Sequence, residues 1–138
     1  MKLYLAGPMT GYENYNIPAF KAAKKELEEQ GYEIQLPYDI ENTAQPDWQW
    51  GDYLGEDIRI LCNDCGGMVL LPEWERSRGA KLEIAAGLMQ SLKFPEFKFY
   101  EYYTESWGQK ELYERSKESM AALWYDWWDH YSKEAAVA

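Results

Sequence analysis

Gly67-Met68-Val69-Leu70-Leu71-Pro72 is an uninterrupted apolar run of strand length in the middle of the chain. Continuous apolar strands are typical of the centre of a parallel sheet that helices cover on both faces, because neither side of such a strand meets water. The run therefore predicts a buried central strand and a fold of the α/β class.

The segments on either side of this run alternate between strand-like and helix-like patterns. We expect strands at 2–6, 32–37, 67–72 and 97–102, and helices at about 16–31, 47–61, 78–92 and 109–135. Asn16 and Asp47 are the expected N-caps of the first two helices. Strands that alternate with helices imply right-handed crossovers. The pattern predicts a flavodoxin- or Rossmann-like three-layer fold, with four to five parallel strands and a long aromatic C-terminal helix. The strand at 32–37 alternates polar and apolar residues and should lie nearer the sheet edge.

Length and composition indicate one globular domain spanning residues 1–138. The 24 acidic against 14 basic residues give a net charge of −10, which argues against binding a nucleic-acid polymer through its phosphates. The apolar runs fall short of the ~20 residues that span a bilayer, and the first residues are too short an apolar run for a signal peptide. We expect a cytoplasmic protein without a membrane partner.

Cys62 and Cys65 form a lone Cys-x-x-Cys. A redox pair or half of a zinc site is one interpretation, and two reduced structural thiols are the other. His130 is the single histidine of the sequence and no second cysteine pair exists, so a four-ligand zinc site lacks its ligands. We expect no metal and no cofactor.

Ligands of parallel α/β sheets bind beyond the carboxyl ends of the strands. This rule selects the segments 7–16, 37–47 and 72–79. In the first, Gly7-Pro8-Met9-Thr10-Gly11 joins a strand to a helix, and its glycines allow a backbone to approach an anion closely. The loop lacks the spacing of a P-loop, and a plain turn explains it equally well.

The segment from Ser77 to Glu83 is more informative. Ser77 is a candidate helix cap, Gly79 permits close approach to the helix start, and Arg78 adds a charge suited to phosphate. Glu83 stands one turn later among apolar residues, so its carboxylate faces either solvent or a site.

Asp57 falls near the inward stripe of the helix at 47–61, although a place on the outer face remains open. Asp64 is better explained as a turn or cap residue. Composition does not rank the remaining loop carboxylates Asp39, Glu73 and Glu75.

These pieces occur in a familiar order: Tyr4-Leu5-Ala6-Gly7-Pro8-Met9-Thr10-Gly11, the helix with Asp57, and Gly79-x-x-x-Glu83. The combination resembles the nucleoside 2-deoxyribosyltransferases and the related nucleotide N-hydrolases. The form with Trp-Glu-Arg-Ser-Arg-Gly-Ala before the glutamate is similar to a bacteriophage and bacterial branch. The resemblance covers residues 1–92, and residues 93–138 are a divergent strand and helix.

The resemblance implies cleavage of an N-glycosidic bond. Glu83 would attack C1′ of the sugar, Asp57 would handle the departing base, and Tyr4 would lie near the nucleophile. The 5′-phosphate would be held by the first loop and by the segment before Glu83, through Gly7, Met9, Thr10, Gly11, Ser77, Arg78 and Gly79. The transferases carry an aspartate where this chain has Ser77 and Arg78, which favours a nucleoside 5′-monophosphate over a free nucleoside.

Two other functions stay open. A binding protein would use the same pocket to hold a nucleotide or a signal nucleotide without turnover. An interaction protein would depend on the aromatic C-terminal segment, whose side chains could pack on the sheet, contact a second copy or stack on a base. The resemblance and these aromatics together lead us to expect a homodimer or higher homo-oligomer.

Overall fold

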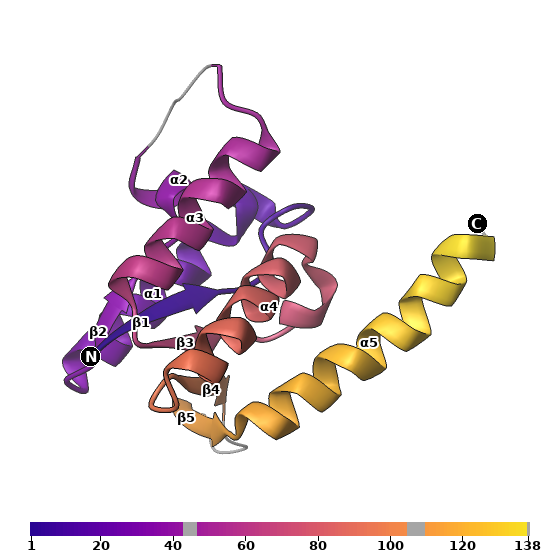
Figure 1. The fold of residues 1–138 in the computed structure, drawn as a ribbon. Coiled ribbons are helices and arrows are strands. Elements are labelled where there is room, and N and C mark those ends of the chain that lie inside the picture. Colours follow the sequence, from indigo (N-terminus) through magenta and orange to yellow (C-terminus); the bar gives the residue numbers. More distant parts are fainter. Residues whose placement is uncertain (43–46, 105–109, 138) are drawn as a thin grey trace.

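A five-stranded sheet organises the computed structural model, which describes residues 1–42, 47–104 and 110–137 (Figure 1). The strand order is β2-β1-β3-β4-β5. The strands are β1 (Lys2–Ala6), β2 (Glu33–Gln35), β3 (Gly67–Leu70), β4 (Lys98–Thr104) and β5 (Lys110–Arg115). The first four pair in parallel. The α/β class is confirmed, with β3 fully buried at the centre and β2 at the edge.

Five α-helices and two short 3-10 turns connect and cover the described strands. They are η1 (Glu13–Asn16), α1 (Ile17–Glu29), α2 (Tyr38–Glu41), α3 (Trp50–Asp64), η2 (Trp74–Arg76), α4 (Arg78–Lys93) and α5 (Lys117–Val137). The chain leaves α1 at Gly31, whose φ of +99° is the left-handed conformation that glycine adopts without strain.

The sheet separates two apolar cores, since successive side chains of a strand point to opposite faces. On one face Leu3 and Leu5 of β1 pack with Phe20 and Leu27 of α1. On the other face Tyr4 and Ala6 of β1, with Met68 and Leu70 of β3, pack against α3, α4 and the start of α5. The helical residues of this second core include Ile60, Leu61, Ala80, Ile84 and Met120. The helices therefore form a layer on each face of the sheet.

The sequence predicts a sheet of parallel strands only and a helix that begins at about residue 109. Both predictions are wrong for the segment that follows β4. Lys110–Arg115 is a strand, and it pairs antiparallel with β4. Its Lys, Glu, Leu and Arg residues favour helix by propensity, but cross-strand contacts outweigh that preference. Glu114 forms an ion pair with Lys98, and Arg115 forms one with Glu101. Residue 109 lies outside the described residues.

The long helix begins after Ser116, whose hydroxyl accepts a hydrogen bond from the backbone N–H of Ser119 at 3.1 Å. Asp47 is likewise not the cap of α3. Gln49 is the N-cap, and its own N–H donates to the Asp52 carboxylate at 2.8 Å. The segment between the strand expected at 32–37 and the helix expected at 47–61 starts with α2, and its residues 43–46 lie outside the described part.

The first half of α5 packs against α4, and the helix then extends away from the sheet (Figure 1). The Trp124 indole N–H donates to the Lys81 carbonyl oxygen at 2.8 Å. The Lys81 ammonium lies 3.1 Å from the ring centroid of Trp127, and its burial lowers the Lys81 pKa to about 8. On the same helix, Tyr125, Trp128 and Tyr131 are exposed. The expected contact with a second copy stays a prediction.

Cys62 and Cys65 are both free, and Cys65 is buried. Burial raises the pKa of the Cys65 thiol to about 12. This environment is that of an inert structural thiol rather than of a reactive thiolate.

Within the described ranges no helix combines the length and the apolar character needed to cross a membrane.

Gly87 lies where α4 packs directly on side chains of the sheet, and this contact yields a stability prediction. A Cβ there would come within 2.6 Å of the Met68 sulfur and 3.1 Å of the Phe99 ring. We expect Gly87→Ala to lower the free energy of unfolding by about 1–3 kcal/mol. Gly55 in α3 is the matched control, because nothing lies within 4 Å of its added Cβ. Gly55→Ala should stabilise by up to about 1 kcal/mol. Urea denaturation measures both, and equal effects would contradict the packing argument.

Candidate functional site

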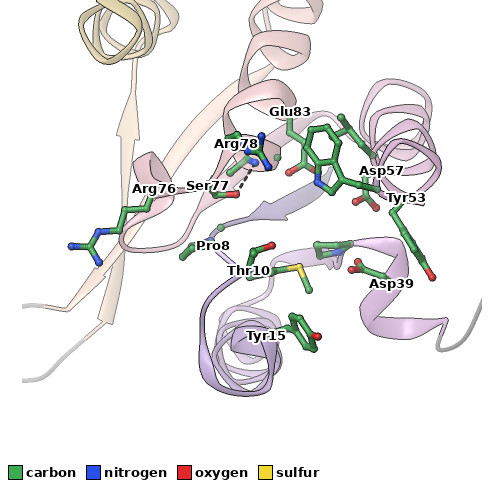
Figure 2. A pocket seen from close by; sticks show the side chains of 17 residues that line it. Pro8, Thr10, Tyr15, Asp39, Tyr53, Asp57, Arg76, Ser77, Arg78 and Glu83 are labelled. Atoms are coloured by element: carbon green, nitrogen blue, oxygen red, sulfur yellow. Dashed lines mark hydrogen bonds between the residues drawn. The ribbon is translucent and has the colours of Figure 1, made fainter. Parts of the chain in front are cut away.

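A cavity of about 360 Å³ opens at the carboxyl ends of β1 and β3 (Figure 2). All three segments that the sequence selects contribute to its wall, together with the first turns of α3. The lining residues are Gly7, Pro8, Met9, Thr10, Tyr15, Pro37, Asp39, Trp50, Tyr53, Leu54, Asp57, Arg76, Ser77, Arg78, Gly79, Ala80 and Glu83. In this sheet β2 lies on one side of β1 and β3 on the other, so the connections that follow β1 and β2 run to opposite sides. The site lies at this switch point in the strand order.

Glu83 of α4 points into this cavity rather than into solvent (Figure 2). Only 5% of the residue is exposed, and its carboxylate accepts a hydrogen bond from the hydroxyl of Tyr4 on β1. Tyr4 is fully buried beneath the site and does not itself line the cavity. The hydrogen bond thus fixes the carboxylate from below and leaves its other side toward the cavity.

Asp57 reaches the same cavity from α3 and is 8% exposed. Its Oδ1 accepts a hydrogen bond from the backbone N–H of Tyr38 at 2.7 Å, which ties α3 to the start of α2. The sequence left both an inward and an outward position open for Asp57, and in the structure Asp57 faces inward. Two carboxyl groups, one from α3 and one from α4, therefore face the same cavity.

Burial dominates the electrostatics of these groups. It raises the pKa of Asp57 from 3.8 to about 7, although the Tyr38 hydrogen bond counteracts the shift. Burial also raises the pKa of Glu83 well above its ordinary value, and the charge of Asp57 adds to the shift while the Tyr4 hydroxyl opposes it. The pKa of Tyr4 is raised by burial and by the two carboxylates, so its hydroxyl stays a donor. Two close buried carboxyl groups disfavour double ionisation, and a shared proton lowers that cost.

The segment before Glu83 folds as the helix start that its sequence predicts. Ser77 caps α4, and its hydroxyl accepts the backbone N–H of Ala80 at 3.0 Å. The N–H groups of Arg78 and Gly79, in the first turn of α4, have no acceptor within the helix. A Cβ on Gly79 would meet only the Ser77 hydroxyl, at 3.8 Å, so the protein's own packing does not require this glycine. The open helix terminus can receive an anion.

The two arginines of the lining differ in what they do. Arg78 places its guanidinium 5.5 Å from the ring centroid of Trp50, at the cavity mouth. Arg76 forms a 3.0 Å ion pair with Glu73 and points away from the cavity (Figure 2). Arg78 is therefore the cation available to a bound group.

In the loop that follows β1, some residues line the cavity and others have a structural role. Gly7, Met9 and Thr10 line the cavity, whereas Gly11 does not, and its φ of +86° serves the turn. Gly7 is also required by packing, because a Cβ there would lie 2.8 Å from the Cβ of Leu71. Asn16 stands at the N-cap position of α1, as expected, but its side chain makes no capping hydrogen bond and donates to the Pro8 carbonyl oxygen at 2.9 Å, which holds the loop closed.

The lining residues that the sequence did not single out include the aromatic residues Tyr15, Trp50 and Tyr53, and Asp39 is a lining carboxylate that composition left unranked. Asp39 stands in a segment that the strand-end rule does select, so a carboxylate there was a usable signal. The aromatic residues of α3 gave no such signal, because in the sequence they fit the apolar stripe of a helix equally well. Around the cavity the described residues hold no cluster of three or more His, Cys, Asp or Glu arranged for a metal ion.

Residues 1–94 match the family model described as "Domain of unknown function (DUF4406)". The match covers more than half of the chain and all of the cavity-lining residues, so the chain belongs to this family. None of the curated proteins compared with the chain matches it.

The raised pKa of Asp57 yields a prediction about stability and pH. Between pH 3.8 and about 7 the folded state holds a proton that the unfolded state releases, so the stability from neutral Asp57 is lost as the pH rises through this window. Asp57→Asn cannot ionise and keeps an acceptor for Tyr38. We expect the stability of the variant relative to wild type to increase from pH 4 to pH 7.5, by up to about 4 kcal/mol.

Guanidinium denaturation across this pH range measures the difference, with the exposed Asp64→Asn as the control. A difference that stays constant with pH would contradict the assignment of the shift to Asp57.

Proposed function

We propose that this member of the DUF4406 family cleaves the N-glycosidic bond of a nucleoside 5′-monophosphate, with Glu83 as the nucleophile. The observation that carries the proposal is the convergence of Glu83 and Asp57 on one cavity that also contains an open helix N-terminus and Arg78. The order of these residues in the chain resembles that of the nucleoside 2-deoxyribosyltransferases and the nucleotide N-hydrolases. As part of the proposal, the β2-β1-β3-β4 order makes the fold flavodoxin-like.

Glu83 is suited to capture the sugar. Breaking a glycosidic bond leaves positive charge on C1′, and an adjacent carboxylate stabilises or traps that centre. The hydrogen bond from Tyr4 favours the ionised form of Glu83, which burial alone disfavours. The positive charge that develops on the sugar favours ionisation of Glu83 further, so the carboxylate nucleophile forms when the sugar is bound.

Asp57 is suited to manage the proton of the leaving base. A pKa of about 7 matches general acid catalysis near neutral pH. In the first step a Glu83 oxygen bonds to C1′, the bond from C1′ to the base nitrogen breaks, and the base takes the Asp57 proton. In the second step water or another base displaces Glu83 from C1′, and Asp57 accepts the proton that is released.

The phosphate would bind at the start of α4. The free N–H groups of the first turn and the positive end of the helix dipole favour an anion, and the Arg78 guanidinium adds a forked donor. This arrangement supports a nucleotide, rather than an unphosphorylated nucleoside, as the ligand. The proposed reaction uses no metal ion.

The proposal is tested by base release from nucleoside 5′-monophosphates, 2′-deoxynucleotides and nucleosides, followed by chromatography. We expect wild type to release base and Glu83→Gln to lower kcat by about a thousandfold or more, since it keeps the shape but removes the nucleophile. Glu96→Gln, exposed and remote from the cavity, should retain full activity. Nucleotide binding without release, unchanged by Glu83→Gln, would instead identify a binding protein.

Arg78 supplies a separate test of the phosphate assignment. Arg78→Gln should raise KM for a 5′-monophosphate about tenfold or more, through loss of a charge-assisted contact, and leave KM for the matching nucleoside unchanged. Arg59→Gln is the control, because Arg59 pairs with Glu56 on α3 outside the cavity lining. An equal rise of KM for both substrates would place the phosphate elsewhere.

A further inference from the structure

The cavity has two chemically different ends. Ser77, Arg78 and Gly79 form one end, with N–H donors and a cation. Asp39 and Asp57 lie together on the opposite side, with the Glu83 carboxylate between the two ends in the view of Figure 2. A ligand that places its anion at the first end and its sugar at Glu83 presents its base to the aspartates.

Asp39 differs from the other two carboxylates in its bonding. Glu83 accepts the Tyr4 hydroxyl and Asp57 accepts the Tyr38 N–H. The Oδ1 atom of Asp39 is buried and accepts no hydrogen bond from the described residues. Because the terminal torsion of an aspartate is broad and roughly two-fold, and no hydrogen bond from the described residues holds this oxygen, the carboxylate can rotate to meet a ligand in the cavity. The side chain thus holds an unused acceptor at the cavity wall.

Asp39 is also near the reacting groups. Its charge contributes to raising the pKa of Asp57, of Glu83 and of Tyr4. Burial raises the pKa of Asp39 itself, because its carboxylate is partly removed from water. Asp39 therefore lines the same cavity as Glu83 and Asp57 and lies near enough for its charge to act on both.

The described lining of the cavity has no side-chain amide, and its two arginines lie at the other end of the cavity from Asp39 (Figure 2). A carbonyl oxygen on the base would set its lone pairs against the carboxylate, whereas an amino group would donate to it. Sites built from buried polar groups reject analogues that leave those groups unpaired.

We propose that Asp39 selects the base: the cavity accepts bases that present an exocyclic amino group to Asp39 and rejects those with a carbonyl oxygen in its place. The substrate class is then the aminopurine and aminopyrimidine nucleotides. This assignment rests on the proposed function, since it supposes that the cavity holds a nucleotide.

Two substrate pairs test it, because the members of each pair differ chiefly by amino against oxo. They are adenosine and inosine 5′-monophosphate, and cytidine and uridine 5′-monophosphate. Calorimetric Kd values are measured on Glu83→Gln, which prevents turnover, and kcat/KM is measured on wild type. In at least one pair the amino member should be favoured about tenfold or more, the effect of leaving a buried acceptor unpaired.

Asp39→Asn keeps the size of the side chain and gives it a donor. It should reduce the amino-to-oxo ratio at least about tenfold, chiefly by improving the oxo member. Asp64→Asn should leave the ratio unchanged. An Asp39→Asn variant that weakens both members equally overturns the proposal, and so does a wild type that prefers the oxo member or neither, whatever the variant does.

The two proposals fail separately. Base release with an amino-to-oxo ratio insensitive to Asp39→Asn overturns the role of Asp39 and leaves glycosidic cleavage standing. Selective binding that depends on Asp39, without release of base, overturns the cleavage and leaves the role of Asp39 standing. Absence of binding and of release for all four nucleotides overturns both.

Discussion

The hydrogen bond from the Tyr4 hydroxyl to Glu83 is the constraint around which the site is built. It joins the first strand to the fourth α-helix across 79 residues of sequence, and both side chains are buried. A buried carboxyl group without a partner is costly, so this bond fixes the rotation of α4 over the sheet. The same rotation directs Ser77 and Arg78 to the cavity mouth and turns Lys81 toward α5.

The sheet supplies the rest of the geometry. Because β1 and β3 are parallel neighbours, the segments that follow them end at the same edge. The close contact of Gly7 with Leu71 brings those two segments together without a side chain between them. The third wall comes from α3, which the Tyr38–Asp57 hydrogen bond ties to the segment after β2. Acidic and basic groups that are scattered in the sequence thus become the two ends of one cavity.

The C-terminal segment is the part of the chain outside the family match. β5 completes the sheet edge through ion pairs with β4, and α5 lies against α4 through Lys81 and two tryptophans. Its N-terminal half thereby supports the helix that carries Glu83. Three aromatic side chains of the same helix, Tyr125, Trp128 and Tyr131, are exposed.

The sequence by itself determined the α/β class, the buried central strand, the cap at Ser77 and the three segments that border the cavity. Each follows from local physics: continuous apolar runs, cap chemistry and the strand-end rule. Only the tertiary structure decided that Lys110–Arg115 is a strand, that Glu83 is buried against Tyr4, and that Asp39 has an unpartnered oxygen. These depend on which residues meet across the chain, and cross-strand pairing and desolvation outweigh local propensity there.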